Sequence, residues 1–299
     1  ASHTYIDDGV YTVTLTVTDN RGATDSASAT KTVLNRLPVA SFTENATTVL
    51  TGEVIHFDAS ASYDPDGSIV SYFWNFGDGT NGTGISVDHS YADDGTYAVT
   101  LTVTDDDGAT DSVSATKYVL NRPPVASFTE SSETVYTGEV ISFDASASYD
   151  PDGTIVSYFW SFGDGTNATG IIVEHAYAED GVYTATLTVT DDDGATGTAT
   201  STTRVLNRAP VASFTESAQT VYTNEIITFN ASSSYDTDGT IIGYFWNFGD
   251  GTNSTQVAPN HAYVENGTYT VTLTVTDNDN VSSTKSATKT VLNLSLIHI

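Results

Sequence analysis

The sequence repeats itself with a step of 86 residues, and this period constrains the fold more than any other feature. Trp74, Trp160 and Trp246 keep this spacing and are the only tryptophans. Each lies in a stretch that reads Tyr-Phe-Trp-Asn/Ser-Phe-Gly-Asp-Gly-Thr. Solenoid repeats run roughly 20–50 residues and need neighbours for a core, whereas 86 residues suffice for a small domain. We therefore predict separate domains in tandem.

The phase of the repeat sets the predicted boundaries. Three complete modules are expected: residues 37–122 (the first module), 123–208 (the middle module) and 209–293 (the last module). Residues 1–36 match only the second part of a module, so they should hold the C-terminal strands of a partial one. On this phase the chain is expected to be a fragment that begins within a domain. Residues 294–299 break the pattern and are predicted to be a non-native or unstructured tail.

Composition excludes several functions. Lysine plus arginine number 9 against 38 acids, a net charge of −29, so a phosphate backbone would be repelled and no nucleic-acid partner is expected. Cysteine is absent, so disulfides and cysteine-based sites are impossible. No apolar run approaches the roughly 20 residues that span a bilayer, so we expect no membrane insertion within this stretch.

Short runs of alternating apolar and polar residues predict strands throughout each module. The clearest is 96–104, in which Tyr97, Val99, Leu101 and Val103 share one face and threonines fill the other. About seven short strands in fewer than 90 residues, with one tryptophan in the third, predict an all-β, immunoglobulin-like sandwich. The modules are expected to follow one another as beads on a string. The expected strands in the first module include 38–43, 53–58, 69–76, 85–89, 96–104 and 113–120.

A tyrosine follows a glycine turn at the start of the penultimate predicted strand. In the first module this segment is Asp93-Asp94-Gly95-Thr96-Tyr97, and it recurs in every copy. This is the setting of a tyrosine corner, in which the hydroxyl ties a loop back to the sandwich. We therefore interpret this residue as structural.

These linked motifs resemble the polycystic kidney disease (PKD) domain family. The resemblance rests on Trp74-Asn75-Phe76-Gly77-Asp78-Gly79, His89-Ser90-Tyr91 and the strand Val99 to Asp105, all recurring in register. The family has Asp where this chain has Asn75, Ser161 and Asn247. The resemblance implies a β-sandwich in an extracellular or surface protein. It also implies a spacer or a protein- or carbohydrate-binding module without catalytic activity.

Acidic loops are the main candidate site. In a sandwich of this topology the Asp64-Pro65-Asp66-Gly67 and Asp105-Asp106-Asp107-Gly108 loops meet the chain entering the module at one end. Carboxylates brought together repel unless they are neutralised, and Ca²⁺ prefers such oxygen ligands. Similar PKD-like domains of secreted collagenases hold Ca²⁺ near the linker. Carried over by position, that resemblance implies these ligands: Asn35, Asp64, Asp66 and Asp105; Asn121, Asp150, Asp152 and Asp191; Asn207, Asp236, Asp238 and Asp277.

The alternative explanation for these loops is turn chemistry. Asp-Pro-Asp-Gly suits a type I turn, and Asp-Asp-Gly suits a hairpin turn. Pro65 and Pro151 become Thr237 in the last module while Asp236 and Asp238 remain. That exchange favours ligands, but both interpretations stay open.

The other candidates are an outward aromatic and a histidine. Alternation around Trp74 places Phe73, and likewise Phe159 and Phe245, on the outer face as a possible ligand contact, unless the strand turns them inward. The histidine aligned at His89 predicts a structural role, because adjacent Asp88-His89-Ser90 cannot form a triad.

Together these features predict a non-catalytic spacer or adhesion array at the cell surface or outside the cell, stiffened by Ca²⁺ at its junctions. Linkers such as Asn121-Arg122-Pro123-Pro124 are short and rich in proline, so neighbours should touch. The alternative is a set of carbohydrate- or protein-binding accessory modules of a secreted hydrolase. Expected partners are surface proteins or polysaccharide. Aligned sequons at Asn81, Asn167 and Asn253 would carry glycans only in a host that adds them.

Overall fold

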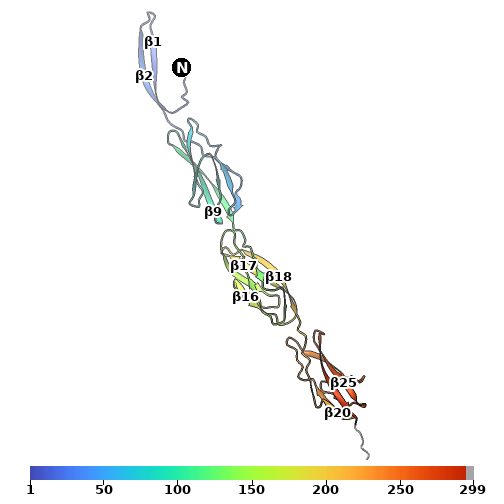
Figure 1. The fold of residues 1–299 in the computed structure, drawn as a ribbon. Coiled ribbons are helices and arrows are strands. Elements are labelled where there is room, and N and C mark those ends of the chain that lie inside the picture. The colour runs from blue at the N-terminus through green and yellow to red at the C-terminus, as the bar shows by residue number, and fades with distance from the viewer. Residues whose placement is uncertain (294–299) are drawn as a thin grey trace, which may run out of the picture. The chain divides into compact units, whose positions relative to one another are not determined.

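The computed structural model describes residues 1–293; the predicted tail at 294–299 lies outside the described residues. Every regular element in the described part is a strand. Residues 1–36 form one antiparallel hairpin of β1 (Gly9–Thr18) and β2 (Thr24–Val33) (Figure 1). The first module contains β3 (Thr43–Glu44), β4 (Thr48–Leu50), β5 (Ile55–Asp58), β6 (Ile69–Asn75), β7 (Asn81–Thr83), β8 (Ser86–His89), β9 (Gly95–Asp105) and β10 (Thr110–Leu120).

The same eight strands recur in the other two modules. The middle module contains β11 (Thr129–Glu130), β12 (Thr134–Tyr136), β13 (Ile141–Asp144), β14 (Ile155–Ser161), β15 (Asn167–Thr169), β16 (Ile172–His175), β17 (Gly181–Asp191) and β18 (Thr196–Leu206). The last module contains β19 (Thr215–Glu216), β20 (Thr220–Tyr222), β21 (Ile227–Asn230), β22 (Ile241–Asn247), β23 (Asn253–Ser254), β24 (Asn260–His261), β25 (Gly267–Asp277) and β26 (Ser282–Leu292).

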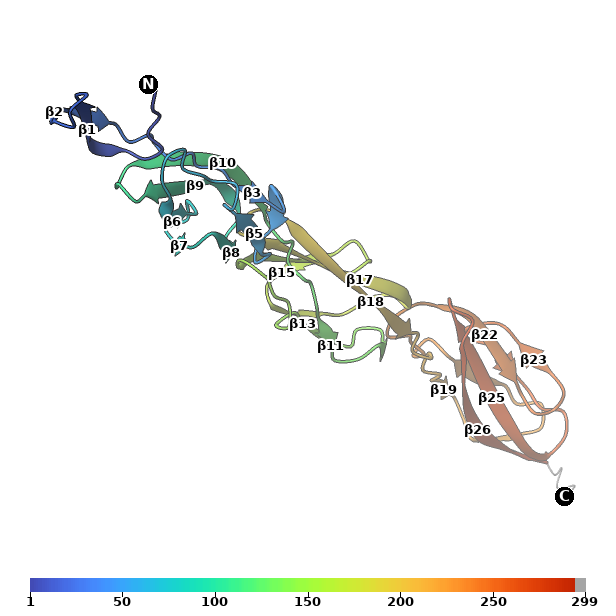
Figure 2. The same cartoon turned by 90° about the horizontal axis from the view of Figure 1, so that it is seen from above.

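Each module is a sandwich of two sheets. In the first module a five-stranded sheet has the order β4-β10-β9-β6-β7, and a three-stranded sheet has the order β3-β5-β8 (Figure 2). The long strands pair antiparallel, while the short β4 pairs parallel with β10. The middle and last modules repeat both sheets in the same order. The predicted all-β, immunoglobulin-like sandwich in tandem is confirmed.

The core follows from the alternation of β9. Val99, Leu101 and Val103 are fully buried, and Trp74 from β6 is fully buried against them. The Trp74 indole N–H donates to the Gly84 carbonyl at 2.9 Å, which satisfies its one polar atom. Apolar residues at every second position thus fix which face of the sheet is buried.

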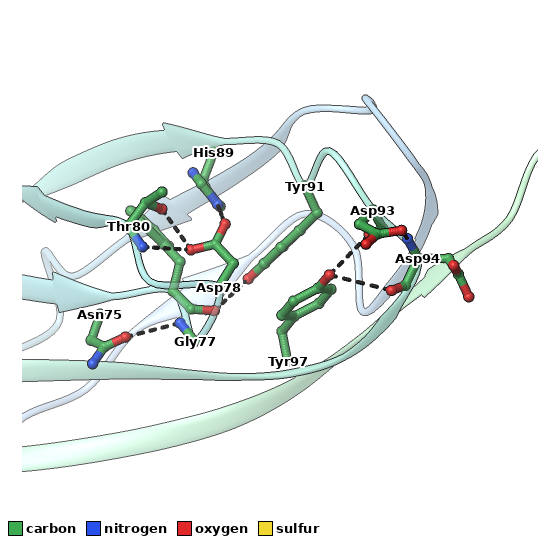
Figure 3. Close-up of polar contacts among 10 residues, drawn as sticks. Asn75, Gly77, Asp78, Thr80, His89, Tyr91, Asp93, Asp94 and Tyr97 are labelled. Carbon is green, nitrogen blue, oxygen red and sulfur yellow. Dashed lines mark hydrogen bonds and ion pairs between the residues drawn. The ribbon is translucent and has the colours of Figure 1, made fainter. Parts of the chain in front are cut away.

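The predicted structural tyrosine and histidine both tie loops down at the Gly-Asp-Gly end of the module (Figure 3). The Tyr97 hydroxyl donates to the carbonyls of Asp93 and Asp94 at 3.0 and 3.3 Å, which is the expected tyrosine corner. His89 lies flat on Phe76, and its Nε2 hydrogen-bonds Asp78 Oδ2 at 2.7 Å. This histidine is therefore held in place by packing and a carboxylate.

The strand predicted at 38–43 is wrong. Only an isolated bridge between Val39 and Tyr63 forms there, and the first strand begins at Thr43. Side chains take the backbone donors instead: the N–H of Ala40 bonds the Asp111 carboxylate, and that of Ser41 bonds a serine hydroxyl. The prediction also missed β4 and β7, because strands of three residues are too short to show alternation.

The described chain divides into two compact units. One holds residues 1–125 together with the loops 149–156 and 190–196, and the other holds the remainder. These two loops of the middle module therefore group with the first module. No helix in residues 1–293 has the length and apolar character needed to cross a membrane.

Candidate junction site

The Asp-Asp-Asp-Gly loop is organised by its first aspartate. Asp105 is almost fully buried; its Oδ1 accepts the N–H groups of Asp107 and Ala109 at 3.1 and 2.7 Å. Its Oδ2 accepts the Asn35 side-chain amide at 3.0 Å. The equivalent Asn121–Asp191 and Asn207–Asp277 pairs bond at 3.0 and 2.9 Å. Two of the predicted ligands in each module are therefore in direct contact.

The Asp-x-Asp-Gly loop holds the other two predicted ligands. Asp64 Oδ1 accepts the N–H of Asp66 at 3.2 Å, which is the local hydrogen bond of an Asx turn. Its Oδ2 is buried and has no hydrogen-bond partner in the described structure. The same holds for four more oxygens, at Asp150 Oδ2, Asp152 Oδ1, Asp236 Oδ2 and Asp238 Oδ1. A buried acceptor without a partner is costly, so turn chemistry accounts for only one oxygen of the first aspartate in each loop, Asp64, Asp150 and Asp236.

A glycine lets the two loops approach each other. A Cβ on Gly67 would lie 2.5 Å from Asp106 Oδ1 and 3.0 Å from Asp64 Oδ2. Asp106 Oδ1 accepts the N–H of Ser68 at 2.7 Å, and this backbone hydrogen bond is the leading cause of its lowered pKa. Asp106 was not among the predicted site residues, although it links its own loop to the backbone next to the Asp64–Gly67 loop.

Two hydrogen bonds cross from the first module to the middle module, and a third holds the linker arginine against the first module. The Thr51 hydroxyl donates to Asp152 Oδ2, and the Arg122 N–H donates to the same oxygen at 2.9 Å. The Arg122 side chain turns back and donates from Nε to the Thr51 carbonyl at 2.9 Å. Thr51 is nearly fully buried. One carboxylate oxygen of the middle module is thus held by the first module and the linker at once.

The junction between the middle and last modules repeats this arrangement. Thr137 and the Arg208 N–H both donate to Asp238 Oδ2, the latter at 2.8 Å. Arg208 Nε donates to the Thr137 carbonyl at 3.1 Å, and its guanidinium also bonds Glu139 at 3.0 Å. The same threonine, arginine and aspartate positions therefore make the contact at both junctions.

The two aspartates of the loop have opposite electrostatic environments. Burial is the leading cause that raises the pKa of Asp150, and the neighbouring Asp152 adds to it. Burial would also raise the pKa of Asp152, but hydrogen bonds from Thr51 and Arg122 outweigh it and lower that pKa. Asp152 is therefore stabilised as a carboxylate, while Asp150 is a half-buried carboxyl whose Oδ2 has no hydrogen-bond partner in the described structure.

Further carboxylates face each other across the junctions. A hydrogen bond with Asp8, followed by burial, raises the pKa of Asp107 to about 6. Burial and then Asp94 raise the pKa of Asp193, and burial and then Asp180 raise that of Asp279. Like charges from successive modules thus come within interaction range at every junction.

The structure brings the predicted ligands together in pairs. Asn35 contacts Asp105 and Asp64 contacts Asp66, and both pairs recur in each module. Within residues 1–293 no group of three or more His, Cys, Asp or Glu side chains is placed to hold a metal ion. The oxygen donors fit Ca²⁺ chemically, and the orphaned carboxylate oxygens lack a partner that a cation would supply.

Sequence reasoning missed the residues that join the modules. Thr51 and Thr137 keep the 86-residue step, as do Arg122 and Arg208. That recurrence was the available signal. The recurrence alone does not reveal that a threonine of one module hydrogen-bonds an aspartate of the next.

The outward aromatic is partly exposed in all three modules. Phe73, Phe159 and Phe245 have 43%, 44% and 46% of their surface accessible. Phe73 pairs with Thr102 on β9, whose hydroxyl bonds that of Ser112 at 2.9 Å on β10. The ring therefore borders a row of hydroxyls on the outer face of the sheet.

Fold and junctions together define a tandem array of immunoglobulin-like sandwiches. The family model "PKD domain" matches residues 1–34, 35–120, 121–205 and 207–291. The chain belongs to the PKD domain family, whose repeats are non-catalytic domains.

Known relatives share this repeat. The dyslexia-associated protein KIAA0319 of Homo sapiens is 33% identical over 316 residues, covering 95% of this chain and 29% of that protein. The pre-pro-metalloprotease PrtV of Vibrio cholerae is 37% identical over 141 residues, covering 47% of this chain and 15% of the relative. The crystal structure of the PKD1 domain of Vibrio anguillarum Epp is 42% identical, with a TM-score of 0.26, covering 29% of this chain and 96% of that one. This chain spans less than a third of either curated relative.

Proposed function

We propose that this chain is a non-catalytic extracellular or cell-surface spacer whose modules are held in register by their junctions. The observation that carries the proposal is the repeated contact of Thr51, Arg122 and Asp152, which recurs with Thr137, Arg208 and Asp238. A freely jointed array would not need the same buried threonine and the same partly exposed arginine at successive linkers. The presence of related repeats in the pre-pro-metalloprotease PrtV supports a role as an accessory module.

Small-angle scattering of the whole chain tests the spacer role. We expect the wild type to give a narrow distribution of interatomic distances. Replacing Thr51 and Thr137 with valine should broaden it by freeing both linkers. A wild-type profile as broad as that of the double variant would contradict the proposal.

We further propose that Ca²⁺ neutralises the junction acids. Asn121, Asp150, Asp152 and Asp191 would hold it at the middle module, with the equivalent residues at the other junctions. Support comes from the unpartnered buried oxygens of Asp150 and Asp152 and from the raised pKa of Asp150, caused first by burial. Affinity should fall in the weak extracellular range of about 10⁻⁴–10⁻³ M. Bound Ca²⁺ would limit bending at the linker.

Calorimetry on the whole chain tests this proposal. Titration with Ca²⁺ should release or absorb heat, and chelation should lower the melting temperature. Asp150→Asn should weaken binding at one junction, whereas Asp144→Asn should leave it unchanged, because Asp144 caps a turn elsewhere in the module. An absence of binding heat together with an unchanged melting temperature would reject Ca²⁺ while leaving the hydrogen-bonded junction intact.

A second candidate function is binding of polysaccharide or a partner protein on the outer sheet face. Its support is the half-exposed phenylalanine in each module, which in the first module lies beside the bonded hydroxyls of Thr102 and Ser112. Three weak sites on one chain would add through avidity. Phe73→Ala, Phe159→Ala and Phe245→Ala together should abolish retention on a polysaccharide resin. The matched control is Val70→Ala on the same strand, which is also exposed; equal retention of both variants would reject this face.

A further inference from the structure

A lysine is fully buried between the two sheets of the first and last modules. Lys117 on β10 has no accessible surface, and its Nζ contacts Glu44 Oε1 on β3. Lys289 on β26 contacts Glu216 Oε1 on β19 in the same way. Each pair therefore bridges the three-stranded sheet and the five-stranded sheet of its module.

The polar atoms of these pairs are poorly satisfied as ions. An ammonium group has three N–H donors, yet both lysine Nζ atoms are buried without a hydrogen-bond partner in the described residues. Glu216 Oε2 is likewise buried and unpartnered. The rings of Phe57 and Phe229 lie 5.8 and 6.0 Å from the respective Nζ. Burying a charge with so few partners costs several kcal/mol.

The nearby tyrosine is already engaged elsewhere. The neighbouring hydroxyl of Tyr91 already donates to the Phe76 carbonyl at 3.0 Å, and burial raises its pKa so that it stays protonated. Tyr263 makes the same bond to Phe248 at 2.9 Å in the last module. Lysine and glutamate therefore face each other with the lysine fully buried and the glutamate side chain 18% exposed in the first module and 23% in the last.

We propose that Lys117 and Glu44, and likewise Lys289 and Glu216, condense into isopeptide bonds. Transfer of one proton from Nζ to the carboxylate gives a neutral amine and a carboxylic acid. The amine nitrogen attacks the glutamate Cδ, a C–N bond forms, and a C–O bond breaks. The departing oxygen takes up a proton from the nitrogen and leaves as water. The step is a dehydration and needs neither oxidant nor reductant.

The product removes the unsatisfied charges. An amide nitrogen keeps one N–H and carries no charge, and one of the two carboxylate oxygens is gone. The bond would join the first strand of one sheet to the last strand of the other, close to both ends of the module. A pulling force on the module would then pass through a covalent link. This inference goes beyond the spacer role and does not depend on it.

The middle module is a built-in control. Thr203 stands where the other modules have lysine. Glu130 accepts hydrogen bonds from the hydroxyls of Ser201 at 2.7 Å and Thr203 at 3.1 Å. With no amine present, this glutamate forms no amide.

Mass spectrometry of the denatured whole chain tests the proposal. The wild type should be lighter than its sequence by two waters, and Lys117→Arg and Lys289→Arg should each restore one. Digestion should release a branched peptide containing Glu44 and Lys117. The double change Ser201→Ala and Thr203→Lys should install a third bond.

The mass of the wild-type chain alone shows whether the isopeptide bonds are present, so the test does not depend on any variant folding. The full sequence mass, obtained from protein whose circular dichroism shows folded β-structure, would overturn the proposal. A water loss that persists in the double arginine variant would also overturn it, by placing the loss elsewhere. Neither result affects the scattering test of the spacer role.

Discussion

The middle module and its two neighbours share a fold but satisfy one buried carboxylate differently. Glu44, Glu130 and Glu216 occupy the same register, each paired with a phenylalanine on the next strand. On the last strand, the first and last modules present a buried lysine, whereas the middle module presents two hydroxyls.

This difference shows which of these polar residues the fold requires. The middle module forms both sheets without a lysine, so the buried pair is not needed for the topology. A buried ion pair is weak evidence for stability, because desolvation opposes the Coulomb attraction. The hydroxyls satisfy the glutamate at lower desolvation cost. The junctions, by contrast, use the same chemistry on both sides of the middle module.

The largest expected effect comes from removing the glutamate. Glu44→Ala leaves a fully buried lysine without its partner, which should destabilise β3 and β10 by about 3–5 kcal/mol. Glu130→Ala leaves only two hydroxyls unpaired, so the middle module should lose about 1–3 kcal/mol. Hydrogen exchange on the whole chain, resolved by peptide, measures both local opening free energies. Equal losses of stability in the two modules would show that the buried lysine does not change the cost of removing the glutamate.

A smaller effect is expected at the junctions, where the modules should behave alike. Thr51→Val and Thr137→Val each remove a hydrogen bond to a carboxylate and should cost about 1.5–3 kcal/mol of local stability. Thr223→Val is the matched control, since Thr223 holds the equivalent position without such a contact in the described residues. Exchange rates of the Asp152 and Asp238 loops report the result. Protection lost at only one junction would show that the two are not equivalent.

Much of the fold was predictable because its determinants are local. The period fixed the repeat, and alternation along 96–104 placed Val99, Leu101 and Val103 in the core. Tyr97 was recognisable from the glycine turn before it. The strand predicted at 38–43 does not form, because side chains of Asp111 and Ser62 accept hydrogen bonds from its backbone N–H groups. These partners lie 71 and 21 residues away in the sequence, so local alternation could not reveal them.

The junction was predictable only in part. Asp64, Asp66 and Asp105 were identified because turn loops of known topology converge at one end. Thr51 was not, because its bond to Asp152 joins residues of different modules. The Lys117–Glu44 pair was missed for a similar reason. A lysine at an inward position of β10 is unexpected, and its partner lies on the other sheet.

The smallest expected effect is a pH dependence at the N-terminal junction of the first module. Contact with Asp8, followed by burial, raises the pKa of Asp107 to about 6. A raised pKa means that this carboxyl favours the folded junction while protonated, and that the benefit is lost as the pH rises through about 6. Lowering the pH from 7 to 5 should therefore slow exchange around Asp8 and Asp107.

The Thr51–Asp152 contact should not respond in that range. The pKa of Asp152 is lowered by Thr51 and Arg122 against the effect of burial, so its contribution persists until the pH falls below the usual aspartate range of about 3.9. Exchange must be compared after correction for the intrinsic pH dependence of amide exchange. Asp107→Asn removes the titrating group and should abolish the difference between pH 7 and pH 5. If that variant keeps the wild-type difference, the Asp8–Asp107 contact is not its source.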